Sequence, residues 1–142
     1  MRQSRPCASV RTQRLSVAPG QFILLVEDDA TISSVLQEAL RSEGLHVEIA
    51  ANGFAALQKL QQAPPALLVL DIGLPALRGD SVGLGVRTSW TPAELPILLI
   101  SALPEKDLSD AIRSIEPFAA MRKPFDLNAF VETVRRGLRI RA

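Results

Sequence analysis

The segment Leu67–Pro75, with the sequence LLVLDIGLP, most strongly constrains how this chain can fold. Four aliphatic residues lead without polar alternation into one carboxylate, Asp71, which is typical of a strand buried on both faces. The strand must begin after Pro65, because proline cannot donate to a sheet ladder, and Gly73 predicts a turn just beyond the carboxylate. Asp71 is therefore predicted at the carboxyl end of a parallel strand, where open α/β sheets bind ligands. Taken alone, the pattern also fits a turn-forming aspartate.

Four further segments have the character of strands, and they are residues 22–26, 45–50, 95–100 and 118–122. Segments with apolar residues at helical spacing alternate with them, and the third of these contains Gly79, Gly83 and Gly85. Each interior glycine costs about 1 kcal/mol relative to alanine, so that helix should be short or irregular. Five strands alternating with five helices predict one α/β domain, a doubly wound parallel sheet with helices on both faces.

Helix boundaries are indicated by caps and breakers. Asp29 and Asp126 are predicted N-caps, Gly44 a C-terminal stop, and Asn52-Gly53 a turn, while a helix opens at Pro104. The residues expected to face the core are Ile32, Val35, Leu36, Ala39 and Leu40, then Phe54, Leu57 and Leu60, then Leu108, Ile112 and Ile115, and finally Leu127, Phe130, Val131, Val134 and Leu138.

The length of 142 residues allows one ordinary domain, which we place at residues 21–142. Residues 1–20 are arginine-rich, lack acidic residues and are predicted to form a disordered basic arm. A net charge of +1 does not predict binding to nucleic acid or a membrane, and no apolar run approaches the ~18 residues of a membrane span. With a single cysteine, Cys7, no internal disulfide can form, and we expect a cytoplasmic protein.

Polar residues stand where four of the predicted strands end. They are Glu27, Asp28, Asp71, Ser101 and Lys123. In a parallel sheet these side chains meet at one edge. Crowded carboxylates repel each other and need a cation, and an all-oxygen ligand set suits Mg²⁺ or Mn²⁺. A carboxylate oxygen left free by the metal can attack phosphorus, which is the aspartyl-phosphate route of covalent catalysis.

The segments ILLVEDD, DIGLP followed by Gly79, LLISA and KPF resemble the signature of the response-regulator receiver domain, a CheY-like family of two-component signalling. The resemblance covers Phe22 to about Leu138 and implies a flavodoxin-like fold with strand order 2-1-3-4-5. It implies the following roles: Asp71 as phosphoacceptor, Glu27 and Asp28 as the acidic pair with Asp28 a direct metal ligand, the Gly73 carbonyl as a further ligand, Ser101 as the switch hydroxyl, Lys123 as the phosphate contact, and a cis peptide before Pro124.

One departure from the family concerns a residue of the last predicted strand. The family usually carries an aromatic residue three positions before the lysine, and here that position is Ala120. Phe118 lies two residues earlier, on the same side of the strand by parity but further from the site, so it is a poor substitute.

The resemblance implies a phosphoacceptor that takes a phosphoryl group from a histidine kinase or histidine phosphotransfer protein and signals through a downstream effector. Such a domain catalyses only its own phosphorylation and dephosphorylation, with a possible homodimer and no direct nucleic acid contact. Two alternatives are a receiver module of a larger hybrid histidine kinase and an interaction module that exchanges no phosphate. An aspartate-dependent phosphatase is disfavoured, because its second acid would stand at Gly73.

Overall fold

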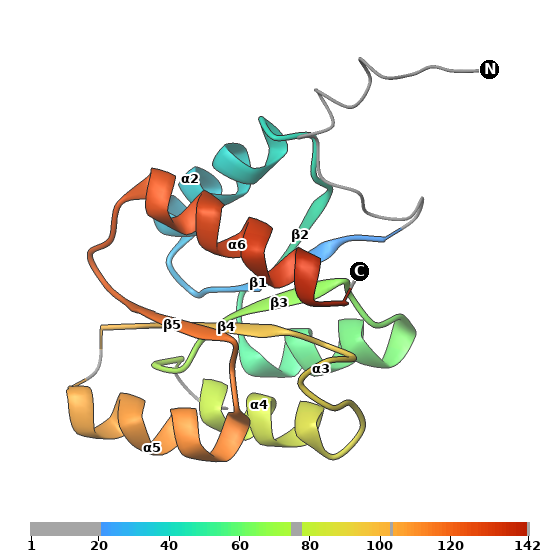
Figure 1. Ribbon diagram of the computed structural model, residues 1–142, viewed down its shortest axis with the longest axis vertical. Helices are drawn as coiled ribbons and strands as arrows, with labels where there is room; N and C mark the ends of the chain where they lie inside the picture. The colour runs from blue at the N-terminus through green and yellow to red at the C-terminus, as the bar shows by residue number, and fades with distance from the viewer. Residues whose placement is uncertain (1–20, 75–77, 103, 142) are drawn as a thin grey trace.

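The computed structural model describes residues 21–74, 78–102 and 104–141, so the predicted N-terminal arm lies outside the described residues. The elements, labelled as in Figure 1, are β1 (Ile23–Val26), α2 (Ala30–Arg41), β2 (Val47–Ala50), α3 (Gly53–Gln62), β3 (Leu67–Asp71), α4 (Gly79–Arg87), β4 (Ile97–Ser101), α5 (Glu105–Ile115), β5 (Ala119–Arg122) and α6 (Leu127–Arg141). In the described part of the chain, no helix is long and apolar enough to cross a membrane.

The five strands form one parallel sheet in the order β2-β1-β3-β4-β5. Helices α2 and α6 cover one face, and α3, α4 and α5 cover the other (Figure 1). The doubly wound, flavodoxin-like fold predicted from the sequence is therefore confirmed. In this topology the carboxyl ends of β1, β3 and β4 lie side by side.

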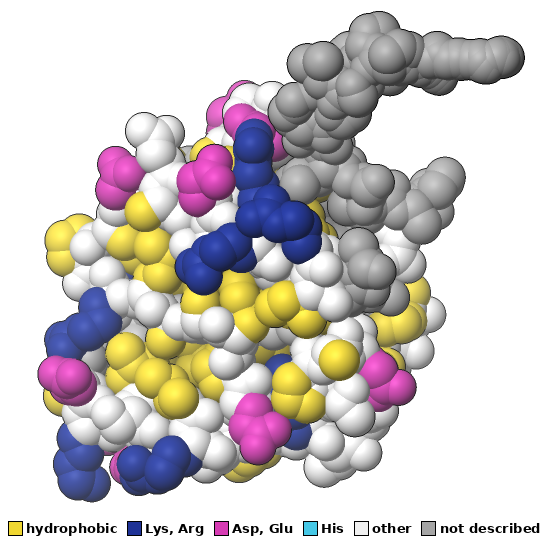
Figure 2. Space-filling view, in the orientation of Figure 1, with side chains coloured by type: hydrophobic (Ala, Val, Ile, Leu, Met, Phe, Trp, Pro, Cys, Tyr) yellow, Lys and Arg dark blue, Asp and Glu magenta, His cyan; other side chains and the backbone are white. Residues whose placement is uncertain are grey.

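The three central strands explain why the apolar runs lack alternation. Every residue of β1, β3 and β4 is buried, because helices cover both faces of the sheet. The edge strands differ from them. Strand β2 has half-buried residues at its middle, and β5 is half-buried with an exposed last residue. Apolar side chains are visible on the molecular face that carries β5 between α5 and α6, and basic side chains gather over α6 (Figure 2).

Capping side chains set several helix ends. The Asp29 carboxylate accepts hydrogen bonds from the amides of Thr31 and Ile32 at 2.9 and 3.0 Å, as predicted for an N-cap. Asn52 also caps a helix, accepting from the Ala55 amide at 2.8 Å, so the predicted Asn52-Gly53 turn is in fact the start of α3. Gly44 has a φ of 86°, a left-handed conformation that suits glycine after a helix.

Four apolar side chains predicted to face the core are exposed instead. Their exposed fractions are 46% for Val35, 63% for Phe54, 40% for Ile112 and 39% for Leu127. Each lies on a helix whose apolar stripe is wider than the strip that contacts the sheet, so the residues on its flank face grooves or solvent. The central residues of the same stripes, Leu36, Leu60, Leu108 and Phe130 among them, are buried as predicted.

Helix α4, which is the third helix predicted from the sequence and is rich in glycine, forms and is short, with nine residues. Arg87 in its last turn connects it to its surroundings. The guanidinium donates to the carbonyl oxygens of Trp90, Thr91, Leu95, Ile115 and Glu116 at distances from 2.6 to 3.3 Å. Burial lowers the pKa of Arg87, and the nearby charge of Glu116 acts in the opposite direction. One side chain thus joins the end of α4, the loop before β4 and the end of α5.

Candidate functional site

The carboxyl edge of the sheet carries the predicted site. Glu27 and Asp28 follow β1, Asp71 ends β3, Ser101 ends β4, and Lys123 follows β5. Each position is fixed by strand register, because Val26 pairs with Leu70 and Asp71 pairs with Ile100. The strand ends therefore bring residues that are far apart in the sequence to one place.

Asp71 is buried, with an exposed fraction of 4%, and both of its carboxylate oxygens have donors. Oδ1 accepts from the Gly73 amide at 2.8 Å, and Oδ2 accepts from Nζ of Lys123 at 3.0 Å. A carboxylate bound on two sides by fixed donors keeps one orientation. The reactive group proposed from the sequence is thus held in place before any ligand binds.

Glu27 shares the same lysine. Its Oε1 lies 2.7 Å from Nζ of Lys123, and its Oε2 accepts from the Asp29 amide at 3.1 Å. Glu27 is 1% exposed, so this is a buried ion pair. A buried pair of this kind stabilises only when its remaining polar atoms also have partners, as they do here.

The charges in the cluster do not balance. Burial raises the pKa of Glu27, and the charge of Asp71 adds to the rise, while hydrogen bonds from Lys123 and the Asp29 amide act to lower it. Burial alone would lower the pKa of Lys123, but its hydrogen bonds and attraction to Glu27 and Asp71 outweigh burial, and the pKa is raised. The lysine is therefore cationic, and the carboxylates have less positive charge near them than they need.

A divalent cation fits this cluster. One carboxylate oxygen from each of Glu27, Asp28 and Asp71 lies within 4.8 Å of the others, and Asp28 is exposed at the rim. The donor set is entirely oxygen, which suits Mg²⁺ or Mn²⁺, and the exposed side leaves room for the waters that Mg²⁺ retains. The acidic cluster is therefore typical of a magnesium site.

Ser101 is fully buried at the end of β4, and its carbonyl oxygen accepts from the Lys123 amide at 2.8 Å. The predicted cis peptide between Lys123 and Pro124 is present. Ala120 packs with the apolar layer beneath α3, α4 and α5, whereas Phe118 packs with the opposite layer. The prediction that Phe118 lies on the same side as Ala120 is therefore wrong, because Phe118 precedes β5 and the alternation of the strand does not reach it.

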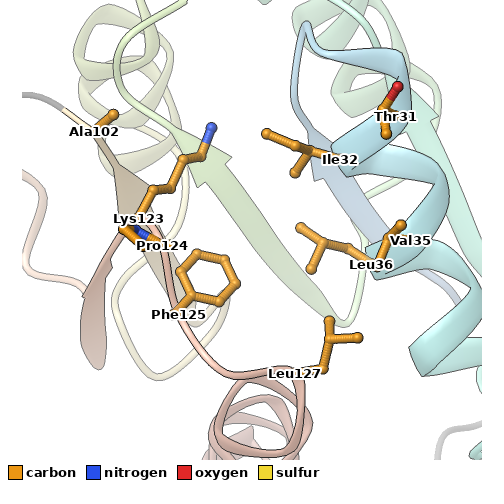
Figure 3. Close-up of a pocket in the computed structure, with 9 residues that line it drawn as sticks. All are labelled: Thr31, Ile32, Val35, Leu36, Ala102, Lys123, Pro124, Phe125 and Leu127. Carbon is orange, nitrogen blue, oxygen red and sulfur yellow. The ribbon is translucent and has the colours of Figure 1, made fainter.

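An apolar groove of 540 Å³ opens beside the cluster. Side chains from α2 and from the segment after β5 face each other across it, with Lys123 at one end and Leu127 at the other (Figure 3). The residues that line it are Thr31, Ile32, Val35, Leu36, Ala102, Lys123, Pro124, Phe125 and Leu127. The helical pattern of the sequence does not reveal this groove, because it places Val35 and Leu127 in the core. Their apolar character was visible, but their rotation toward solvent was not.

Solved structures share this fold. A CheY-like response regulator receiver domain protein from Methanospirillum hungatei JF-1 has a TM-score of 0.78 at 24% identity, covering 85% of this chain and 95% of that chain. Chemotaxis protein CheY4 of Vibrio cholerae has a TM-score of 0.74 at 25% identity, covering 82% of this chain and 97% of that chain. The fold and the acidic pocket thus define a CheY-like α/β domain.

Sequence comparison gives the family. The model described as "Response regulator receiver domain" matches residues 23–135, and the chain belongs to this family of two-component signalling. The transcriptional regulatory protein KdpE of Mycobacterium tuberculosis is 31% identical over 120 residues, which are 83% of this chain and 51% of the relative. The DNA-binding response regulator MtrA of Mycobacterium leprae is 32% identical over 121 residues, 84% of this chain and 52% of the relative. The chain spans about half the length of these curated relatives.

Proposed function

We propose that this domain accepts a phosphoryl group on Asp71 and signals by changing its affinity for a partner. The observation that carries the proposal is the Asp71 carboxylate, buried at the end of the central strand and held between Lys123 and the Gly73 amide. Glu27 and Asp28 lie beside it in a cluster that attracts a divalent cation. Glu27 is also buried beside Lys123, but Asp71 is the carboxylate that ends the central strand β3.

In the proposed reaction an oxygen of Asp71 attacks the phosphorus of a phosphohistidine. The new O–P bond forms as the N–P bond breaks, and the leaving nitrogen keeps the electron pair and then takes a proton from water. Lys123 donates to the phosphoryl group as negative charge spreads over its oxygens, and Ser101 supplies a hydroxyl beside it. Hydrolysis of the acyl phosphate later restores the carboxylate.

The metal site would be formed by Glu27, Asp28, Asp71 and the carbonyl of Gly73, with Asp28 as a direct ligand. Mg²⁺ or Mn²⁺ bound there would neutralise part of the carboxylate and phosphoryl charge. Binding in the unphosphorylated state should be weak, because few protein oxygens replace the waters that Mg²⁺ is reluctant to lose. Asp28→Ala should weaken binding in a Mg²⁺ titration, and equal affinity in both proteins would remove Asp28 from the site.

The phosphodonor is proposed to be a histidine kinase or histidine phosphotransfer protein that docks in the apolar groove. Two features support this choice. The groove ends at Lys123, so a helix seated in it would bring a histidine close to Asp71. Most of its exposed side chains, such as Val35, are apolar, as expected for a groove that receives the apolar face of a helix. Four further expectations stay predictions: a downstream effector protein as partner, a possible homodimer, no direct contact with nucleic acid, and a cytoplasmic location.

The test is incubation with Mg²⁺ and phosphoramidate, a small phosphodonor, followed by intact-mass measurement. Wild type should gain the mass of one phosphoryl group, and Asp71→Asn should gain none. Asp80→Asn is the matched control, because Asp80 is a carboxylate in the first turn of the next helix and lies outside the cluster. An unchanged mass gain in Asp71→Asn, or no gain in wild type, would overturn the proposal.

A further inference from the structure

The first residue of α4 lies in contact with the backbone of the phosphoacceptor strand. A Cβ atom added at Gly79 would lie 2.1 Å from the carbonyl oxygen of Asp71, 2.5 Å from Cα of Ile72 and 2.8 Å from the carbonyl carbon of Asp71. All three atoms belong to the main chain. No rotation of a side chain can therefore relieve the contact, and either the helix or the strand end would have to move.

The strand end is also held on its other side. The Ile72 amide donates to the carbonyl oxygen of Ile100 in β4 at 3.2 Å. The backbone at Asp71 and Ile72 is thus enclosed between β4 and the start of α4. A side chain at position 79 would either break this bond or push α4 away from the sheet.

The segment that such a side chain would displace is the end of β3, which includes the proposed phosphoacceptor Asp71. The Gly73 amide, two residues beyond Asp71, fixes the orientation of its carboxylate, while Lys123 and Glu27 are anchored on β5 and β1. A shift of Asp71 and Gly73 would therefore move the carboxylate relative to groups that stay in place. We infer that Gly79 is a positioning residue for the site, because its missing side chain sets where the Asp71 carboxylate and the Gly73 backbone lie. This inference rests on the proposed function for its phosphorylation readout only.

Two other glycines of the same helix provide matched controls. A Cβ atom at Gly83 would meet side-chain atoms of Ile115 at 2.5, 2.9 and 3.1 Å, so alanine there should destabilise the contact between α4 and α5, away from the site. A Cβ atom at Gly85 would meet nothing within 4 Å. The three alanine variants thus separate a change at the site, a loss of packing and a substitution without a clash, which should leave the site unchanged and the fold at least as stable.

The experiment measures three quantities on Gly79→Ala, Gly83→Ala and Gly85→Ala under conditions in which each protein is folded. These are the urea unfolding midpoint, the Mg²⁺ affinity from amide chemical shifts, and the initial rate of phosphorylation by phosphoramidate. Gly79→Ala should lose roughly tenfold or more in rate, because small misplacements of reacting groups are costly, and should bind Mg²⁺ more weakly. Gly83→Ala should lose stability but keep the wild-type rate and Mg²⁺ affinity.

Wild-type rate and Mg²⁺ affinity in folded Gly79→Ala would overturn the inference, as would equal losses in Gly83→Ala. If Gly79→Ala does not fold alone, it is combined with Gly85→Ala, which is expected to stabilise the protein. A double variant that still does not fold would show that Gly79 acts in folding and not in positioning, and would overturn the inference. If wild type accepts no phosphoryl group, the proposed function fails, while the Mg²⁺ titration still decides whether Gly79 positions the site.

Discussion

Phe118 packs directly on Gly137. Two atoms of its ring lie 2.3 and 2.5 Å from the position that a Cβ atom of residue 137 would take, so only a glycine leaves room for the ring there. The contact fixes Phe118 in the layer covered by α6, on the opposite side of the sheet from Ala120. No aromatic ring of β5 is therefore available beside Ser101, since the strand itself reads AAMR.

The first prediction concerns the conformational change on phosphorylation, and it follows from the missing aromatic ring at Ala120. A phosphate mimic should alter amide exchange at Ala102 and in the first turn of α5 more than in β5, because a methyl group at position 120 cannot move through the volume of a ring. A ligand shifts an equilibrium only by its different interaction with two states, and a missing ring removes one such difference. The measurement compares amide exchange with and without beryllofluoride in wild type and Ala120→Tyr, and the tyrosine variant should show added changes in β5. Large changes across β5 in wild type, with no addition from the tyrosine, would contradict this account.

The second prediction concerns Lys123. Replacing it by methionine leaves the buried carboxylates of Glu27 and Asp71 without their cation, which should lower the free energy of unfolding by about 3 kcal/mol in the absence of divalent ions. Mg²⁺ should restore more stability to this variant than it adds to wild type, because it replaces the missing positive charge. Urea unfolding with and without Mg²⁺ tests this. Lys106→Met is the control, since its ion pair with Asp110 is exposed and should contribute little; a similar small loss in both variants would argue against the charge imbalance.

The third prediction separates docking from chemistry. Val35→Lys places a charge in the apolar groove and should slow phosphotransfer from a panel of autophosphorylated histidine kinases by roughly tenfold or more. Phosphorylation by phosphoramidate should keep its wild-type rate, because Val35 does not contact Asp71. Phe54→Lys alters a more exposed apolar residue on the opposite face of the sheet and should leave both rates unchanged. Equal effects of the two lysines on protein donors would remove the groove as the docking site.

The fourth prediction uses the open space around Gly85. Alanine at this helical position should raise the free energy of unfolding by up to about 1 kcal/mol, because it restricts the unfolded chain without a clash. Gly44→Ala should destabilise the protein instead, since its φ of 86° disfavours a side chain even though the space is empty. Thermal or urea unfolding of the two variants measures the sign of the change in the free energy of unfolding. Stabilisation by both would show that the backbone conformation at Gly44 does not disfavour a side chain.

The fifth prediction concerns Arg87. Methionine at this position leaves several carbonyl oxygens without a donor, and the free energy of unfolding should fall by roughly 2 kcal/mol. Lysine should recover only part of the loss, because it lacks the planar fork of donors. Amide exchange should increase most at the end of α5. Arg113→Met, on the exposed side of α5, is the control, and a loss of the same size there would show that the contacts of Arg87 have no special weight.

The sheet and most of the candidate site could be predicted from the sequence for one physical reason. Strands buried on both faces appear as unbroken apolar runs, and in a parallel sheet the polar residues that follow them share an edge. The sequence therefore predicts that Asp71, Glu27 and Lys123 meet, and the structure brings both carboxylates within hydrogen-bond range of Lys123. The capping positions Asp29 and Asp126 were readable for a similar reason, because their hydrogen bonds are local.

What could not be predicted depends on contacts distant in the sequence. The rotation of a helix about its axis is set by packing, so Val35 and Phe54 could not be told from true core residues. The face taken by Phe118 depends on Gly137, which lies in another element. The role of Arg87 could not be predicted from the sequence, because its hydrogen bonds go to carbonyl oxygens, which every residue has.

That property of Arg87 decides which positions are free to change. Among the described residues, the hydrogen bonds of this guanidinium all go to main-chain oxygens, so they depend on the path of the backbone, while the Glu116 side chain adds only a nearby charge. Trp90 and Thr91 can therefore be replaced without loss of these hydrogen bonds, provided that the loop keeps its backbone conformation. Arg87 itself cannot be replaced without losing these hydrogen bonds. We therefore expect related sequences to keep this arginine while the residues whose carbonyl oxygens it binds vary.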